Sequence, residues 1–268
     1  MILDIKTEYE KRKKELKEKD LRDIVLVTIL TDNNEASIKY VSNKEKLLKE
    51  LNIECVNIRL NNPKQEELEE KIKELNRDKK ITGIILELPL SKNLDTNKAI
   101  ALIDNKKDVD GLTNENLGKL IKNEDTILPC TVYAVSKIIS IANVDLEGKK
   151  VVIIGRSILV GKPLSIFLTN KNATCTLCHS KTKNLKEISK TADILIVAIG
   201  KKHFITKDYV KDGALVIDVG TNFENGKVYG DVDENVSNET NIITHVPNGV
   251  GLMTKLCVVE NLIKLKQS

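Results

Sequence analysis

A regular alternation of two patterns constrains the fold most: short apolar runs rich in β-branched residues are separated by amphipathic helical stretches. The expected strands are Ile24–Leu30, Ile53–Leu60, Ile81–Leu88, Lys150–Ile154, Thr174–Cys178, Ile194–Ile199, Leu215–Val219 and Ile242–Val246. The clearest helical stretches between them are Ala36–Leu51, Gln65–Leu75 and Val132–Ile141. This alternation predicts βαβ units, and therefore mainly parallel sheets with helices on both faces.

Eight strands would also suit a single (β/α)8 barrel. The stretch from Asp104 to Pro129 carries no regular pattern, however, and interrupts the alternation near its middle. We therefore expect an α/β protein of two α/β domains, one formed by residues 1–128 with 252–268 and the other by residues 129–251. The last helix, Leu252–Leu265, is expected to pack back onto the first domain.

Charge and composition exclude several functional classes. The 43 basic and 39 acidic side chains leave a net charge of only +4, and Trp is absent, which argues against nucleic-acid binding. No apolar run approaches the ~20 residues that span a bilayer. The charged helical pattern from Met1 to Lys19 lacks the apolar core of a signal peptide. With five scattered cysteines, these features indicate a cytoplasmic protein.

One cysteine cluster matches the CxxCH pattern of covalent haem attachment, from Cys175 through Cys178 to His179. The same residues form a strand pattern, in which positions i and i+3 face opposite ways. Haem attachment also requires export. We therefore interpret the segment as a plain strand and expect no metal.

The segment from Lys150 to Pro163 has the pattern of a strand, a turn and a helix. It is buried up to Gly155 and enters a helix near Pro163, a residue suited to a first helical turn. Glycines at such a turn let the backbone approach phosphates, and the helix N-terminus favours an anion. The spacing departs from G-x-G-x-x-G, so a tight turn without a ligand remains the alternative.

The following strand bears on which dinucleotide would bind. NAD enzymes usually place an acid at its end to hold the ribose hydroxyls. Residues 178–182, Cys-His-Ser-Lys-Thr, contain none, and Arg156 lies at the preceding turn. A basic, hydroxyl-lined pocket favours the 2′-phosphate of NADP.

Lys44 occupies a position on the helix Ala36–Leu51 where the apolar stripe requires an inward-facing residue. A snorkelling lysine, whose amine reaches water, is one interpretation. A lysine in a partly dry cleft that shuttles protons is the other. Tyr40 lies one turn earlier on the same face.

Three further features are candidates for the same site. Glu87 ends a buried strand, where α/β sheets build their sites. Asp108 and Asp110 form an acidic pair in a turn, and each is equally compatible with a solvated turn or an ion pair. The glycine-bearing loop from His245 to Gly251 suits close approach by a flat ring.

Taken together and in order, these segments resemble the bifunctional methylenetetrahydrofolate dehydrogenase/cyclohydrolase family over nearly the whole chain. The matching segments are residues 37–44, 83–90, 107–112, 129–131, 155–163, 178–182, 217–220 and 246–254. The resemblance implies NADP-dependent oxidation of 5,10-methylenetetrahydrofolate and hydrolysis of the methenyl product to 10-formyltetrahydrofolate. It also implies a place in one-carbon metabolism and purine biosynthesis, and a homodimer formed through the nucleotide-binding domains.

The resemblance carries roles over to individual residues. Lys44 would be the central catalytic residue, with Glu87 beside it, Tyr40 stacking on folate and Asp110 holding the pterin. Gly249 and Leu252 would line the substrate site. The cofactor residues would be Thr131, Gly155, Arg156, Ser157, Gly161, Ser180, Gly220 and Thr221, with Arg156 and Ser180 at the 2′-phosphate.

The sequence departs from the family pattern at several positions. Glu87 stands where Gln is usual, Val132 and Leu252 stand where Pro is usual, Asn248 replaces a Gly and His245 replaces a common Pro. An anion at position 87 would stabilise the charged ammonium of Lys44. We expect hydrolysis, which needs proton movement through the lysine, to be altered more than hydride transfer. A dehydrogenase with weak or absent cyclohydrolase activity is therefore one alternative, and a catalytically silent NADP-binding sensor is another.

Overall fold

The computed structural model describes residues 1–31, 35–237 and 241–267, and it divides the chain into two compact units. The first comprises residues 1–11 and 131–254, and the second comprises residues 12–130 and 255–268. Both are α/β, and their sheets are open rather than closed into a barrel, as expected. The division passes through the helices α1 (Ile5–Lys17) and α9 (Val250–Gln267).

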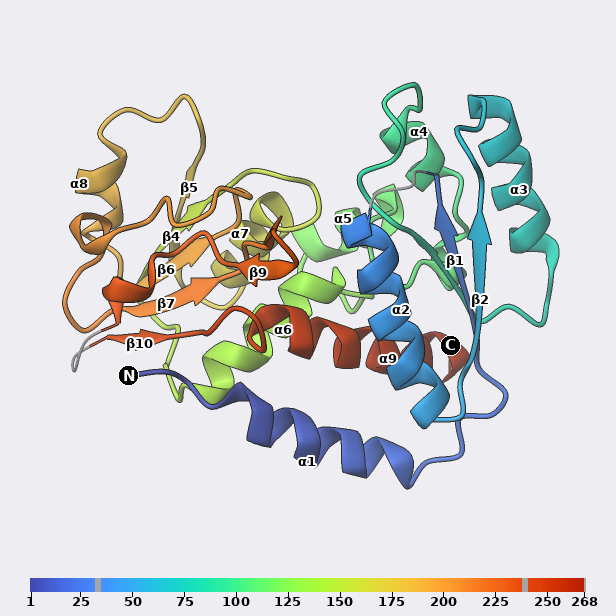
Figure 1. Ribbon diagram of the computed structural model, residues 1–268, viewed down its shortest axis with the longest axis horizontal. Helices are drawn as coiled ribbons and strands as arrows, with labels where there is room; N and C mark the ends of the chain where they lie inside the picture. The colour runs from blue at the N-terminus through green and yellow to red at the C-terminus, as the bar shows by residue number, and fades with distance from the viewer. Residues whose placement is uncertain (32–34, 238–240, 268) are drawn as a thin grey trace. The chain divides into compact units, whose positions relative to one another are not determined.

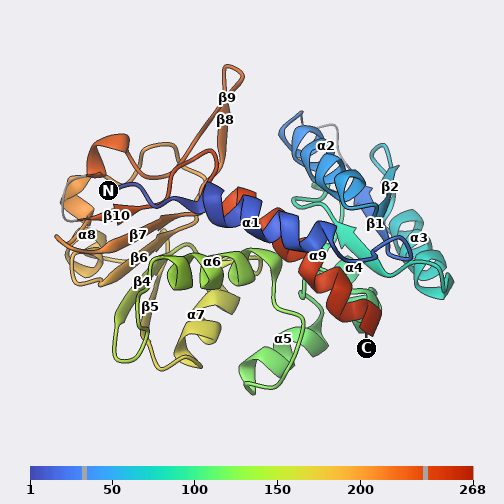
Figure 2. The same ribbon diagram turned by 90° about the horizontal axis from the view of Figure 1, so that it is seen from below.

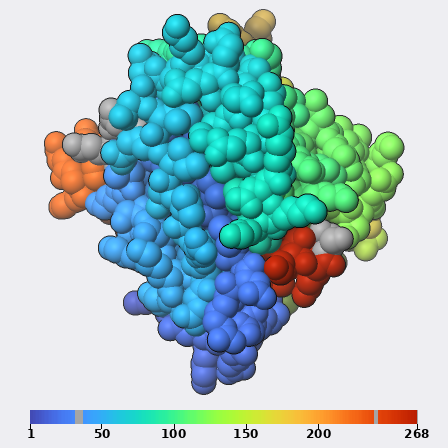
Figure 3. Space-filling view, turned by 90° about the vertical axis from the view of Figure 1, so that its right-hand side faces the viewer, coloured from blue at the N-terminus to red at the C-terminus, as the bar shows by residue number. Residues whose placement is uncertain are grey.

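The second unit is built on a three-stranded parallel sheet of order β2-β1-β3. Its strands are β1 (Val25–Leu30), β2 (Glu54–Arg59) and β3 (Gly83–Leu86), and its helices are α2 (Glu35–Glu50), α3 (Gln65–Arg77), α4 (Thr96–Ala101) and α5 (Asn114–Ile121). β1 and β3 are almost wholly buried, whereas β2 is the exposed edge. Figure 3 shows the face of this unit that carries β2 and α3, in light blue to teal.

The stretch from Asp104 to Pro129 is more ordered than its sequence pattern indicates. It contains a single helical turn, η1 (Asn105–Lys107), and the helix α5. A parallel bridge joins Ile84 to Asp108, so the chain after η1 continues the sheet beside β3. The pattern was missed because helix α5 has only eight residues and two inward-facing side chains, Asn116 and Leu120.

The first unit is built on a five-stranded parallel sheet of order β10-β7-β6-β4-β5 (Figure 1). The strands are β4 (Lys150–Ile154), β5 (Thr174–Cys178), β6 (Ile194–Val197), β7 (Leu215–Asp218) and β10 (Ile242–Ile243). The helices are α6 (Cys130–Ile141), α7 (Gly161–Thr169) and α8 (Leu185–Ser189), with single turns η2 (Lys207–Tyr209) and η3 (Glu234–Val236). The strands are added first on one side of β4 and then on the other, which is the order of a doubly wound α/β sheet.

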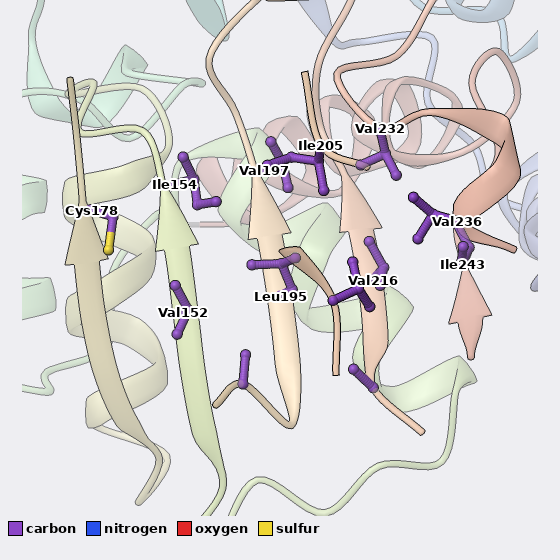
Figure 4. Close-up of a cluster of buried hydrophobic side chains, with 13 residues drawn as sticks. Val152, Ile154, Cys178, Leu195, Val197, Ile205, Val216, Val232, Val236 and Ile243 are labelled. Atoms are coloured by element: carbon purple, nitrogen blue, oxygen red, sulfur yellow. The ribbon is translucent and has the colours of Figure 1, made fainter. Parts of the chain in front are cut away.

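The core of the first unit explains why its strands are continuous apolar runs. Alternate residues such as Val152, Leu195 and Val216 form a buried cluster on one face, which Figure 4 shows across all five strands. Val151 and Ile153, which alternate with them, are fully buried on the opposite face. Helices α6 and α7 lie together beside the sheet (Figure 2). Because both faces of β4, β6 and β7 are covered, no polar alternation remains in these three strands.

Two features of the first unit differ from the sequence interpretation. Residues 1–11 belong here and not with the second unit, because Ile2 pairs with Ile243 and the Leu3 amide donates to the Ile243 carbonyl at 2.9 Å. A hairpin of β8 (Asn222–Glu224) and β9 (Lys227–Tyr229) also projects from the sheet (Figure 2). Its strands are three residues long, too short to give a period-2 signal.

Candidate functional site

The helix α2 buries a lysine in the second unit. Only 1% of Lys44 is exposed, and its ammonium group forms an ion pair with the carboxylate of Glu87. The snorkelling interpretation is therefore wrong, because the amine faces a carboxylate inside the protein rather than water. Tyr40 lies one turn earlier on the same face, with its ring centroid 5.8 Å from the Lys44 nitrogen. A buried charge of this kind is stable only when it is paired, so Lys44 and Glu87 have to be considered together as one ion pair.

Glu87 and Asp110 reach the same place from two neighbouring stretches of the sheet. Glu87 directly follows β3, and its amide donates to the Ile29 carbonyl of β1 at 2.9 Å. Asp110 comes two residues after the bridge between Ile84 and Asp108. Both acids thus lie at the carboxyl end of parallel strands, where open α/β sheets bind ligands.

The electrostatic environment shows that these groups are close. Loss of hydration raises the pKa of Asp110 to about 6, the positive charge of Lys44 opposes this change, and the negative charge of Glu87 adds to it. Tyr40 is affected in the same direction. Burial, together with the charges of Glu87 and Asp110, raises the pKa of its hydroxyl well above the ordinary value, although 37% of the residue is exposed. The charges of both acids thus act on the Tyr40 hydroxyl, while part of the side chain remains open.

The two acids of the turn, Asp108 and Asp110, have different roles. Asp108 is 1% exposed, and its carboxylate accepts from the Thr113 amide and from the Asn116 side chain, both at 2.8 Å. It therefore secures the start of α5 and is a structural residue. Asp110 is only partly buried and lies among Lys44, Glu87 and Cys130, so it is the acid available to a ligand.

Cys130 belongs to this cluster, although sequence reasoning assigned it no role. Its thiol donates to the Val109 carbonyl at 3.3 Å and is also hydrogen-bonded to Asp110. Burial, with the nearby charge of Asp110, raises the pKa of the Cys130 thiol well above its ordinary value, so it stays protonated and acts as a donor. The sequence feature that could have identified Cys130 as a site residue is its position at the start of α6, directly after Pro129.

The expected phosphate turn lies in the first unit, between β4 and α7. Gly155 has a φ of +124°, which disfavours a side chain, and a Cβ at Gly161 would lie 1.8 Å from the Gly155 carbonyl oxygen. The start of the helix therefore packs directly on the turn. Arg156 and Ser157 are exposed there, and Pro163 lies in the first helical turn as expected.

The ends of β4 and β5 place two more predicted residues on adjacent turns. Ile154 pairs with Cys178, and the Gly155 amide donates to the Cys178 carbonyl at 2.9 Å. Arg156 and Ser180 therefore both lie just beyond neighbouring strand ends, and both are exposed. The segment after Cys178 is a tight turn in which the His179 amide donates to the Thr182 hydroxyl at 2.9 Å. It carries no carboxylate, so these two turns fit a cofactor with an extra phosphate.

Two buried aspartates, not predicted from the sequence, organise the other loops of this edge. Asp231 accepts from the amides of Ile199, Gly200 and Lys201 at 2.7–3.0 Å. Asp218, at the end of β7, accepts from the amides of Gly220, Asp231 and Val232 at 2.9–3.1 Å. Burial nonetheless raises the pKa of Asp218 to about 6. Thr221 is exposed immediately after Gly220 and Thr131 is half-buried near the start of α6, so each is accessible to a ligand.

The remaining predicted residues do not belong to the unit that contains the lysine cluster. Gly249 and Leu252 belong to the first unit, at the start of α9, whereas Tyr40, Lys44, Glu87 and Asp110 belong to the second. Cys175 and Cys178 lie in β5, so the strand interpretation of the CxxCH segment is confirmed. Within the described residues, no group of three or more His, Cys, Asp or Glu side chains could hold a metal ion, and no helix is long and apolar enough to cross a membrane.

Comparison with known proteins gives matches over nearly the whole chain. Residues 2–110 match the tetrahydrofolate dehydrogenase/cyclohydrolase catalytic domain, and residues 129–268 match the NAD(P)-binding domain of the same enzymes. The bifunctional protein FolD of Clostridium novyi is 48% identical over 262 residues, which cover 97% of this chain and 94% of that protein.

Solved structures agree with these sequence matches. The bifunctional enzyme FolD from Campylobacter jejuni superposes with a TM-score of 0.94 at 40% identity, covering 100% of this chain and 98% of the other. The Trypanosoma brucei methylenetetrahydrofolate dehydrogenase-cyclohydrolase, solved with NADP and an inhibitor, gives a TM-score of 0.94 at 30% identity, covering 100% and 97%.

Proposed function

Because this chain belongs to the tetrahydrofolate dehydrogenase/cyclohydrolase family, we propose that it oxidises 5,10-methylenetetrahydrofolate with NADP and hydrolyses the methenyl product to 10-formyltetrahydrofolate. The observation that carries the proposal is the buried cluster of Lys44, Glu87, Tyr40 and Asp110 at the carboxyl end of a parallel sheet. The glycine-bearing turn between β4 and α7 in the first unit is the feature on which we base cofactor binding. We assign folate chemistry to residues 12–130 with 255–268, and cofactor binding to residues 131–254.

The cofactor site uses backbone and side chains of the first unit. Gly155, Ser157 and Gly161 would face the pyrophosphate, because glycines let the backbone approach a phosphate closely and the N-terminus of a helix favours an anion. Arg156 and Ser180 would hold the 2′-phosphate through charge-assisted hydrogen bonds. Thr131, Gly220 and Thr221 would contact the rest of the cofactor. When bound, NADP accepts a hydride from the folate carbon, so the protein's task in this step is alignment.

The folate site uses the second unit. Tyr40, whose side chain is partly open, would stack on the folate ring, and the carboxylate of Asp110 would accept hydrogen bonds from the pterin. Gly249 and Leu252 are proposed as further substrate contacts. These groups would hold the reacting carbon of the substrate in place for both reactions. Such positioning matters because a misplacement of about 1 Å costs roughly 10²-fold in rate.

Lys44 is the proposed proton carrier in the hydrolysis. Water adds to the methenyl carbon, and the proton released by that water must move before a ring nitrogen can leave. The Lys44 amine is the buried basic group of this cluster and can take and return that proton. The transfer has to take place within the ion pair of Lys44 and Glu87, and an ammonium group can donate a proton but cannot accept one.

Replacing Lys44 by Met tests the assignment. Hydrolysis, measured with methenyltetrahydrofolate supplied directly, is expected to fall by about 10²–10⁴-fold, because proton transfer contributes that much. The dissociation constant of NADP should not change, since the cofactor turn lies in the other unit. Undiminished hydrolysis by the variant would remove Lys44 from the mechanism.

A dehydrogenase with weak cyclohydrolase activity is the second candidate, and the ion pair between Lys44 and Glu87 favours it. The two candidates differ in whether the methenyl intermediate accumulates. If hydrolysis keeps pace with oxidation, the methenyl absorbance stays low throughout the reaction with methylenetetrahydrofolate and NADP. A methenyl absorbance that rises together with the NADPH signal identifies the dehydrogenase with weak cyclohydrolase activity.

We also propose that the enzyme is a cytoplasmic homodimer formed through its nucleotide-binding domains, as the family resemblance implies. All five cysteines are free thiols, in keeping with a reducing compartment. Light scattering at the concentrations used for assays measures the assembly directly. A mass near the 30.0 kDa of one chain would contradict the dimer.

A further inference from the structure

Asn261, on α9, places a buried amide against two loops of the second unit. The residue is 3% exposed, and its side-chain nitrogen lies 2.8 Å from the Val109 carbonyl oxygen and 2.9 Å from that of Leu128. Carbonyl oxygens only accept hydrogen bonds, so the NH2 group, and not the amide oxygen, must face them. Its two hydrogens thereby satisfy two backbone groups that would otherwise lack these partners.

Both loops lead into the proposed folate site. Val109 immediately precedes Asp110, and Leu128 lies two residues before Cys130. The Cys130 sulfur is 3.4 Å from the Asn261 nitrogen, and its thiol donates to the same Val109 carbonyl at 3.3 Å. One side chain of the last helix thus contacts the backbone next to Asp110 and the thiol that is hydrogen-bonded to Asp110.

We propose that Asn261 is a positioning residue, which sets the placement and hydrogen bonding of Asp110 through the Val109 carbonyl and the Cys130 thiol. The proposal rests on the proposed function in one respect, that Asp110 holds the pterin. Asn261 itself acts only through its neighbours.

The thiol of Cys130 links Asn261 to the ionisation of Asp110. The thiol has one hydrogen and two acceptors within reach, the Val109 carbonyl at 3.3 Å and the Asp110 carboxylate, and its interaction with the carboxylate lowers the Asp110 pKa. The amide of Asn261 donates to the same Val109 carbonyl and thereby weakens the competing bond from the thiol. Without Asn261, the thiol hydrogen meets no competing donor at the Val109 carbonyl and is drawn more strongly toward it, so the Asp110 pKa should rise. The other groups that face Asp110, namely Lys44, Glu87, Asp108 and Tyr40, are unchanged by this substitution.

The substitution Asn261→Leu, which keeps the shape and removes both donors, provides the test. We expect the KM for methylenetetrahydrofolate to rise about tenfold through misplacement of Asp110. The acid limb of the pH profile of kcat/KM should move to higher pH, and the NADP dissociation constant should stay constant. If the leucine variant does not fold, the same measurements are made on Asn261→Ala, which adds no bulk.

The matched control is Asn76→Leu. Asn76 also joins two segments of the second unit through its amide, which donates to the Leu102 carbonyl at 2.7 Å and accepts from the Asp104 amide at 3.0 Å. A purely structural effect would lower the folded fraction in both variants and leave the KM and the pH profile of each unchanged. Equal KM and pH effects in the two variants would overturn the proposal.

A second readout separates this inference from the proposed function. The titration of the Asp110 carboxyl carbon by NMR, in protein without substrate, requires no turnover. It is expected to move to higher pH in Asn261→Leu and not in Asn76→Leu. If the enzyme fails to oxidise the folate but the titration moves, the proposed function fails and the positioning stands. An Asp110 titration identical to that of the unsubstituted protein would overturn the positioning.

Discussion

At the scale of single residues, the unusual feature is a lysine and a glutamate that meet where little water reaches. The side chains of Lys44 and Glu87 are 2% and 11% exposed. Removing one partner of such a pair leaves an uncompensated buried charge. We therefore expect the residue at position 87 to affect the proton chemistry of Lys44.

Glu87→Gln is expected to raise the ratio of cyclohydrolase to dehydrogenase rate by about tenfold. The amide can still accept a hydrogen bond from Lys44, but it no longer stabilises the ammonium through a full charge. The matched control is Glu69→Gln, which removes a carboxylate of similar exposure, 13%, that pairs with Lys98 at 2.7 Å. If Glu87→Gln leaves the ratio unchanged, the proposed influence of Glu87 on hydrolysis is wrong.

Asp110 is expected to impose a pH dependence with a midpoint of about 6, the pKa to which burial raises it. If the carboxylate binds the pterin, kcat/KM for the folate falls as the pH drops through this value. Asp110→Asn should lower kcat/KM and remove that limb. A limb near pH 6 that persists in the variant would assign it to another group.

The raised pKa of Asp110 also predicts how the stability of the folded protein depends on pH. Whereas kcat/KM should fall as the pH drops, the contribution of Asp110 to stability should fall as the pH rises. Because the folded pKa of Asp110 is about 6 and the ordinary value is 3.8, the folded protein binds the proton more tightly. The contribution of Asp110 to stability is therefore lost as the pH rises from about 3.8 to about 6. Asp110→Asn should be more stable at pH 7, by on the order of 1 kcal/mol given its partial exposure. Denaturant unfolding at pH 4 and pH 7 measures this difference, which should be smaller at pH 4.

Arg156→Ala is expected to weaken NADP binding by about 10–100-fold, which corresponds to the loss of charge-assisted hydrogen bonds to a phosphate. The affinity for NAD, which lacks the 2′-phosphate, should barely change. Lys171→Ala removes another exposed positive charge from the same unit and serves as the control. An equal loss of affinity for NADP and for NAD would show that Arg156 contacts a part of the cofactor other than the 2′-phosphate.

At the scale of elements, the position of α7 depends on the absence of a side chain at Gly161. Gly161→Ala would place a Cβ against the Gly155 carbonyl, so the helix must move away from the turn. We expect a loss of about 1–3 kcal/mol in the free energy of unfolding and weaker NADP binding. The control is the helical Gly118, where an added Cβ would meet no neighbouring atom within 4 Å. Gly118→Ala should stabilise by roughly 0.5–1 kcal/mol. Thermal and denaturant unfolding, with cofactor titration, compare the two.

Element prediction from sequence succeeded where burial imposes a pattern. All eight expected strands are present, and the clearest of them are continuous apolar runs because they are covered on both faces. The hairpin of β8 and β9 and the helix α5 were missed, because short elements with few inward-facing residues carry little periodic signal. Lys44 was predicted to face inward by the same periodicity, but its pairing with Glu87 depends on which strand end lies opposite α2.

At the scale of the whole molecule, sequence order predicted the α/β class with two sheets, and the family resemblance supplied the chemistry. Long-range partners were beyond such reasoning. Ile2 pairs with Ile243, and Asn261 contacts residues more than a hundred positions earlier in the chain. No local pattern specifies such contacts, since they follow from how the terminal segments pack on the two sheets. The motif at Pro129 marked Cys130, but only the structure shows what its thiol contacts.

The central claim is that one chain couples NADP-dependent oxidation to hydrolysis at Lys44. The most direct test mixes the protein with methylenetetrahydrofolate and either NADP or NAD, and follows the reduced cofactor and the methenyl absorbance together. We predict rapid formation of NADPH, a much slower reaction with NAD, and conversion of the methenyl product to 10-formyltetrahydrofolate. The absence of NADPH formation from methylenetetrahydrofolate would contradict the account.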